Sequence, residues 1–163
     1  MAVTARSPLG GSTTARKWWL DINTGTAAAP VWTGVHGITE FKPNLEPTLQ
    51  DDSDFDSGGD KSQTVTARAW SLDLKLARKV TLALATAYDP GQEAIRLASE
   101  NIGTANSLSV RFYEMEPAGP RVEAYSGRAA VSWTPDGGAM DALDMVSVSL
   151  SGQGKRTAIA HPA

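Results

Sequence analysis

The sequence predicts a mainly β domain with one flanking α-helix, and three observations lead to this class. Apolar and polar residues alternate over 64–78, a helix start follows at Asp89, and further strand-like runs fill most of the remaining chain. With 163 residues, the chain has the size of one domain that buries about two-thirds of its unfolded surface. We expect a β-sandwich or barrel in one domain over 15–160, with a flexible N-terminal arm at 1–14 and a short tail at 161–163.

The composition excludes several classes of protein. Charged residues make up 20% of the chain and the net charge is −3, which argues against a general binder of nucleic-acid phosphates. Cysteine is absent, so disulfides, thiolate metal sites and cysteine nucleophiles are excluded. The first residues lack the apolar segment of a signal peptide, and no run reaches the ~18 apolar residues of a membrane span. We expect a soluble protein that is synthesised in a bacterial cytoplasm.

The first half of the domain carries strand signals at 17–23, 31–35 and 39–49. Pro43 and Pro47 interrupt the third run, and proline cannot donate to a β-ladder. We therefore expect that strand at the edge of a sheet.

A long acidic loop at 50–62 separates two predicted strands. Its five aspartates and one lysine give a charge of −4, which leaves the rest of the chain at +1. A hairpin needs only two to five residues to turn, so we interpret this loop as a contact surface, with Phe55 as a buried aromatic anchor. The expected contact residues are Asp51, Asp52, Asp54, Phe55, Asp56 and Asp60.

Calcium is an alternative ligand of the same loop, because Asp52, Asp54 and Asp56 follow the alternating pattern of an EF-hand. The EF-hand also needs glycine at loop position six and glutamate at position twelve, where this chain has Ser57 and Gln63. We therefore prefer a protein contact and predict neither a metal nor a cofactor.

The strand at 64–78 is the clearest element of the sequence. Its apolar face carries Trp70, Leu72, Leu74 and Leu76, and its polar face carries Ser71, Asp73 and Lys75. At about 3.3 Å per residue the strand reaches on the order of 45 Å, a length that suits the wall of a large barrel.

The single helix is predicted at about 89–102. Asp89 is its N-cap, Pro90 occupies the first helical position, and Gln92 completes a capping box. Gly103 ends the helix. The expected buried stripe consists of Ala94, Ile95, Leu97, Ala98 and Ile102.

Three more strands are predicted at 107–114, at 121–133 with a bulge at Gly127, and at 143–152. In the last strand, the inward residues are Leu143, Val146, Val148 and Leu150, and the outward residues are Ser147, Ser149 and Ser151. The following segment, 152–156, lacks the spacing of a phosphate-binding loop and is interpreted as a flexible exit from the strand.

No residue pattern demands an enzyme. His36 and His161 are too few for a zinc site without cysteines. A hydrolase would have to use Glu114 or Asp73, and Glu114 with Glu116 is the only carboxylate pair of note, without a nucleophile or triad. Five tryptophans favour an alternative function, a carbohydrate-binding β-sandwich of a virion or secreted protein.

Three segments carry a resemblance to a known family: 34–59 with the acidic loop, Tyr88-Asp-Pro-Gly-Gln-Glu93, and Val148-Ser-Leu-Ser-Gly-Gln-Gly-Lys-Arg156. Together, over 17–162, the sequence resembles the major tail tube protein of long, flexible-tailed bacteriophages, particularly those of actinobacteria. Related tubes occur in contractile injection machines.

The resemblance implies a virion protein that forms hexameric rings, whose inner sheets join in one barrel and whose stack conducts DNA during ejection. It implies four kinds of partner: further copies of the chain, a tape measure protein, tail terminator or tail-tip proteins, and passing double-stranded DNA without tight binding. No membrane partner is implied.

Two sets of residues receive roles under this interpretation. We expect the acidic loop and the arm at 1–14 to connect stacked rings, with Arg16, Lys17, Lys155 and Arg156 as basic partners. The residues expected to face the DNA are Ser71, Asp73, Lys75, Ser147, Ser149 and Ser151. The strands at 64–78 and 143–152 are expected to contribute to a sheet that continues between subunits.

Overall fold

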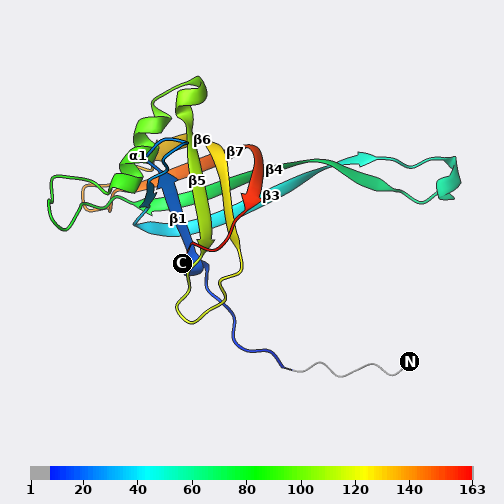
Figure 1. Cartoon of the computed structure of the whole chain (residues 1–163), viewed down its shortest axis with the longest axis horizontal. Helices are drawn as coiled ribbons and strands as arrows, with labels where there is room; N and C mark the ends of the chain where they lie inside the picture. The colour runs from blue at the N-terminus through cyan, green and yellow to red at the C-terminus, as the bar shows by residue number, and fades with distance from the viewer. Residues whose placement is uncertain (1–7, 163) are drawn as a thin grey trace.

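The computed structural model describes residues 8–162 and consists of one curled antiparallel sheet with a single α-helix (Figure 1). The mainly β fold with one flanking helix is therefore confirmed. The strands are β1 (Trp18–Asn23), β2 (Trp32–Gly34), β3 (Ile38–Asp51), β4 (Gln63–Ala77), β5 (Ser107–Glu114), β6 (Ala124–Pro135) and β7 (Met145–Ala158). The helix is α1 (Pro90–Ser99), and short 3-10 turns form η1 (Ala15–Lys17), η2 (Phe55–Ser57) and η3 (Gly103–Asn106).

The strands follow the order β2-β1-β5-β6-β7-β4-β3 in one continuous sheet. Its two ends approach each other, because the ring of Trp18 on β1 stacks on that of Phe41 on β3 with centroids 5.6 Å apart. Phe112 of β5 contacts both rings. The sheet thus curls around its own apolar face, and β3 lies at an edge, as Pro43 and Pro47 predict.

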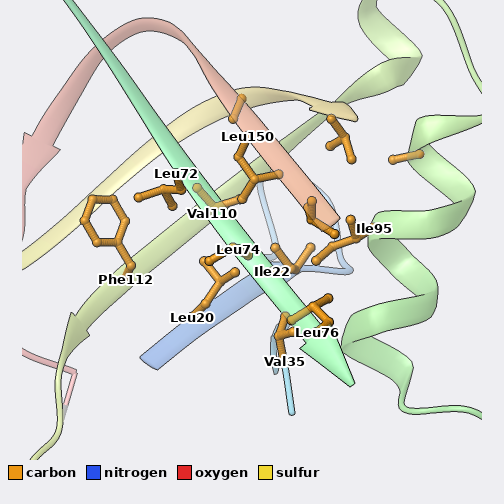
Figure 2. Packing of buried hydrophobic residues seen from close by; sticks show 14 of the residues in the cluster. Leu20, Ile22, Val35, Leu72, Leu74, Leu76, Ile95, Val110, Phe112 and Leu150 are labelled. Carbon is orange, nitrogen blue, oxygen red and sulfur yellow. The ribbon is translucent and has the colours of Figure 1, made fainter. Parts of the chain in front are cut away.

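The core lies inside this curl (Figure 2). The predicted apolar faces of the two long strands are confirmed, because Trp70, Leu72, Leu74 and Leu76 are buried together with Val146, Val148 and Leu150. Helix α1 covers one open side, and its Ile95 points into the core (Figure 2). The strand alternation therefore defines most of the core, and the helix completes it.

The start of α1 differs from the prediction in one hydrogen bond. Asp89 is the N-cap and accepts a bond from the backbone N–H of Gln92, at 3.1 Å. The expected capping box is wrong, because the Gln92 side chain donates to the carbonyl oxygens of His36 and Ala77 instead, at 2.7 and 2.9 Å. Gln92 is fully buried and must satisfy its amide on neighbouring elements, so it ties the helix to the end of β4.

The end of α1 also differs. The helix ends at Ser99 rather than at Gly103, and Gly103 begins the separate turn η3. Two residues of the expected buried stripe are exposed: Leu97 on the outer face of the helix and Ile102 beyond its end. Of the expected stripe, Ile95 and Ala98 are buried and Ala94 is half-buried, because a helix of this length presents only a narrow face to a curved sheet.

The bounds of the last two strands, β6 and β7, differ from the predicted ones. The bulge at Gly127 is confirmed by a shift of register between Ser126 and Arg128. Leu143 lies before β7 and is exposed, so its expected inward position is wrong. The interpretation of 152–156 as a flexible exit is also wrong, since β7 continues to Ala158 and pairs with β6.

The reason for this continuation is the indole of Trp70. The ring packs against Gly127 and Gly152, and a Cβ atom at either glycine would overlap it. The two glycines therefore serve close packing of one large side chain rather than flexibility.

The two ends of the described chain behave differently. Residues 8–14 are exposed and form no helix or strand, while the preceding part of the predicted arm, 1–7, lies outside the described residues. At the other end, His161 lies within 2.6 Å of the carbonyl oxygen of Glu114 and contacts the Tyr113 ring. None of the described helices is long and apolar enough to span a membrane.

Candidate functional site

The β3–β4 hairpin projects far beyond the body of the domain (Figure 1). We call its paired outer part, residues 46–51 and 63–69, the stem. All stem residues are exposed, and the apolar Leu49 and Val65 lie opposite each other on it. A two-stranded ribbon without a core on either face is marginal by itself, so the stem gains little stability from burial within the chain.

We call residues 52–62 at the outer end of the stem the tip. The turn η2 has a reciprocal capping box: the Asp54 side chain accepts a bond from the Ser57 hydroxyl, and Ser57 accepts one from the backbone of Asp54. Gly58 then takes a left-handed conformation with φ of 63°. The tip is thus an ordered turn rather than a loose loop.

Phe55 sits on this turn, and the expectation that it is buried is wrong for the single chain. Its side chain is fully exposed at 106% of the reference area. The turn is too short to form a core of its own, and no other described residue covers the ring. A rigid, exposed aromatic residue is the usual anchor of a protein contact.

The aspartates of the tip and of the adjoining end of the stem differ in their partners. Asp51 forms an ion pair of 3.2 Å with Lys61, and Asp52 accepts a bond from the Thr64 hydroxyl. The bond with Ser53 lowers the pKa of Asp51, and the bond with Thr64 lowers that of Asp52. The carboxylates of Asp56 and Asp60 have no hydrogen-bond or ion-pair partner among the described residues. Within residues 8–162, no cluster of His, Asp and Glu has the arrangement of a metal site.

The six predicted lumen residues form three cross-strand pairs on one face of the sheet. Ser71 pairs with Ser151, Asp73 with Ser149, and Lys75 with Ser147. Their neighbours in sequence are core residues, so this face is the outer one. The sequence therefore predicts correctly that these side chains lie together, although their role is a separate question.

The outer face neutralises much of its own charge. Ser149 and Asn44 donate to the two oxygens of Asp73, at 3.2 and 2.9 Å. Asp136 accepts a bond from Ser147 and pairs with Lys75 at 3.1 Å. These two contacts, the Ser147 bond first, lower the pKa of Asp136. The result is a smooth polar surface with short, mutually bonded side chains.

Besides the outer edge of β2, two strand edges of the body have no strand partner in the described chain. One is the outer edge of β3, and the other is the end of β6 over 131–135, beyond the last pair with β5. At the start of this second edge, the Asn106 amide bonds both the N–H and the carbonyl of Val131, at 2.9 and 3.2 Å. Asn106 thus ends the β5–β6 ladder in the way a short strand would.

A groove opens where β4 and β7 separate. The two strands pair from Ser71 and Ser151 inward, but their outer parts diverge and leave a cavity of about 620 Å³. We call it the fork groove. Trp70 forms its apex and donates from the indole N–H to the carbonyl of Gly154, at 2.9 Å. Its rim carries Arg68, Lys155 and Arg156.

The sequence did not reveal the fork groove or the role of Asn106. The groove depends on where pairing between two strands stops, which residue patterns do not encode. An isolated glycine within a strand indicates a bulge or close packing. The sequence predicts the bulge at Gly127, but the packing of Gly127 and Gly152 against Trp70 was not predicted.

The tryptophans do not form a sugar-stacking platform. Arg111 covers Trp32 and Arg78 covers Trp133, with cation centres 4.7 and 5.1 Å from the ring centroids. Trp18 stacks on Phe41 and Trp70 is buried, so Trp19 alone is half exposed. The carbohydrate-binding alternative therefore loses the observation on which it was based.

Glu114 has a structural environment rather than a catalytic one. Burial alone would raise its pKa, but bonds from the Lys17 amine and from the N–H groups of Glu123 and Val122 lower the pKa to about 2. The other proposed acid, Asp73, lies on the open outer face and is bonded to Ser149 and Asn44. The Glu114 carboxyl group therefore lacks the raised pKa that a general acid needs.

Comparison of the fold with solved structures finds similar proteins, whereas comparison of the sequence does not. No protein-family signature and no curated protein matches this sequence. A structure of the tail of an empty gene transfer agent (GTA) particle, with C6 symmetry, matches with a TM-score of 0.65 at 10% identity, over 91% of this chain and all of that chain. This protein has the fold of a phage-like tail component.

Two further matches come from a different particle. A chain of the anti-feeding prophage baseplate, six-fold symmetrised, gives a TM-score of 0.60 at 9% identity over 95% of this chain and all of that one. A chain of the tube terminating cap of the same prophage gives 0.60 at 12% identity, over 98% and 99% of the two chains. At such identities the likeness extends to the fold alone.

Proposed function

We propose that this protein is a structural virion protein that forms the tail tube of a long, flexible-tailed bacteriophage. The projecting hairpin carries this proposal, because its stem and tip have no partner within the described chain. Copies would form hexameric rings, the rings would stack into a tube, and DNA would pass through it. A tape measure protein, terminator and tail-tip proteins would be its other partners. The six-fold symmetry of the tail and baseplate particles described above supports the ring.

Ring closure uses two of the free strand edges of the body. β3 of one copy pairs with residues 132–135 of β6 in the next, so that the four strands β6, β7, β4 and β3 of every copy join one barrel. Unpaired edges invite pairing with another chain, and a closed ring removes them. β4 and β7 join this barrel from within the subunit, since each already has a strand on both sides.

Stacking uses the stem and the tip. The exposed Phe55 is the apolar anchor, and Asp51, Asp52, Asp54, Asp56 and Asp60 supply the negative charge around it. The arm, whose described part is exposed, adds contacts between rings. Exposed ion pairs contribute only about 0–1 kcal/mol each, so the aromatic residue contributes more than any single aspartate.

The outer polar face lines the lumen. Six copies at −3 give about −18 per ring (6 × −3), and duplex DNA carries one negative charge per ~1.7 Å. A serine-rich face with internally paired charges offers the DNA few unpaired cations, which suits a conduit that must let the genome slide.

Electron microscopy tests the assembly. We expect the purified protein at high concentration to form rings or tubes in negative stain. A protein that stays monomeric at every concentration, with a folded circular dichroism spectrum, would contradict the proposal.

Ejection kinetics test the lumen. Replacing both Asp73 and Ser149 by Lys should leave tubes intact but slow DNA ejection, and more strongly at low salt because screening is weaker there. The matched control places lysines at Asp141 and Ala142, outside this face. Unchanged ejection at low salt, in intact tubes, would mean that another face lines the channel.

A further inference from the structure

The stem and the body leave the fork groove open, and its chemistry is distinct from that of the rest of the surface. Its floor is apolar, with Leu45, Val65 and Trp70, and its rim is basic, with Arg68, Lys155 and Arg156. None of the three cations forms an ion pair with the described residues, although Arg156 also stacks on the Tyr125 ring at 4.2 Å. The groove therefore fits a partner that combines an apolar anchor with negative charge.

The tip of this same chain has that combination. Phe55 is fully exposed on an ordered turn, and the carboxylates of Asp56, within the turn, and Asp60, after it, have no partner among the described residues. The segment from Asp51 to Lys61 carries five aspartates and one lysine, a charge of −4 (−5 + 1). Charge and apolar character thus match between two regions that one copy cannot bring together.

A copy cannot fill its own groove, because the stem holds the two regions apart. Residues 63–69 form an extended ladder with β3, and at ~3.3 Å per residue they separate the tip from the apex of the groove by roughly 20 Å. Only a second copy can supply the tip. A contact between two different patches of identical chains repeats from copy to copy, either around a ring or along a stack. The proposed ring already closes through strand edges, so we assign this contact to the stack.

We propose that the fork groove of one copy receives the tip of a copy in the adjacent ring, with Phe55 against Leu45, Val65 and Trp70, and with Asp56 and Asp60 against Lys155 and Arg156. This inference rests on the proposed tube and names the receiving surface of its stacking contact. The length of the stem then sets the spacing between rings.

Charge exchange tests the pairing directly. The double change Lys155→Glu and Arg156→Glu should prevent stacking while rings still form, and so should Asp56→Lys with Asp60→Lys. Mixing the two reversed proteins should restore alternating stacks, since each offers the complement that the other lacks. As a control, Asp141→Lys with Asp144→Lys, at the opposite end of the domain, should stack normally.

Apolar truncation gives a second measurement. Phe55→Ala should raise the protein concentration needed for half-maximal tube formation by about tenfold or more. Leu82→Ala is the matched control, because Leu82 is equally exposed at 108% but lies in the linker before α1. Equal effects of the two changes would contradict a specific role of Phe55.

Crosslinking locates the contact. Because the chain contains no cysteine, only the introduced cysteines can form disulfides. A mixture of Asp56→Cys and Lys155→Cys proteins should form disulfide-linked pairs between the two variants on oxidation. A mixture of Asp56→Cys and Asp141→Cys proteins should not. Crosslinking of the second mixture, or none in the first, would overturn the assignment of the groove.

The outcomes separate this inference from the proposed function. Wild-type protein that forms neither rings nor tubes contradicts the proposed function. If the wild-type protein forms tubes and the groove variant also stacks normally, the groove is not the receiving surface, while the proposed function stands. If that variant stacks normally but loses binding to duplex DNA, the groove is a DNA contact and the tip docks elsewhere.

Discussion

The inner and outer halves of β4 form one continuous strand, but they differ in how far their side chains are buried. In the inner half, Trp70, Leu72, Leu74 and Leu76 alternate with polar residues and are buried in the core. In the outer half, residues 63–69 pair equally regularly with β3, yet every one of them is exposed. Hydrogen bonding alone therefore does not distinguish the halves. The halves differ in burial. The inner half stabilises the fold because its apolar face is removed from water, whereas the outer half leaves its surface exposed.

The sharpest contrast comes from one truncation in each half. Leu72→Ala should lower the free energy of unfolding by about 2–5 kcal/mol, because Leu72 is completely buried and leaves a cavity. Leu49→Ala, on the stem, should change it by less than about 0.5 kcal/mol in the monomer. Urea unfolding of dilute protein measures both. A large loss for Leu49→Ala would mean that the stem contributes to the stability of the isolated subunit.

The junction between the halves depends on Trp70 and its glycines. Gly152→Ala should destabilise the domain by about 1–3 kcal/mol, because the added methyl group overlaps a ring that cannot move away. Gln153→Ala, one residue further along β7 and exposed, is the control and should be nearly neutral. Thermal unfolding compares the two, and equal melting temperatures would contradict tight packing at this junction.

A strongly lowered carboxyl pKa in the body of the domain, at Glu114, should make the body sensitive to acid. The pKa of Glu114 lies at about 2, below its ordinary value of 4.5, so its stabilising contribution is present above pH 4.5 and is lost as the pH falls toward 2. Lys17→Met removes one cause of the lowered pKa and should shift acid unfolding to higher pH. Glu114→Gln should flatten the profile. A profile that neither change alters would assign the acid sensitivity to other groups.

Removing the outer half should have the smallest effect on the subunit and the largest on its assembly. Replacing residues 48–67 by the turn Asn-Gly retains the pair of Pro47 with Arg68 at the end of a short hairpin. We expect the urea midpoint to stay within experimental error while tubes disappear. Tubes of normal length from this variant would contradict a role of the hairpin in stacking.

Sequence patterns predicted the parts that depend on local chemistry. Alternation identified both long strands and their core faces, and Asp89 with Pro90 identified the start of the helix. The errors share one cause, which is tertiary context. Gln92 leaves its expected cap for distant carbonyls, Phe55 has nothing nearby to cover it, and Leu143 precedes the strand it was assigned to.

The sequence likewise predicted one part of the candidate site and missed another. The six residues of the outer face follow from a period of two, so their grouping was predictable. The fork groove and the free edge at 131–135 depend on where one strand stops pairing with another, and pairing between segments distant in sequence leaves no local signature.

Asn106 imposes a chemical constraint that few other positions share. Its oxygen accepts from the N–H of Val131 while its nitrogen donates to carbonyls of Val131, Ala98 and Asn101. Aspartate has the shape but lacks the donor, and leucine has neither group. In the ring we propose, the incoming strand of a neighbour therefore meets an occupied position at Val131 and must begin beyond it. One amide thus acts as a stop that gives all six seams of the ring the same alignment.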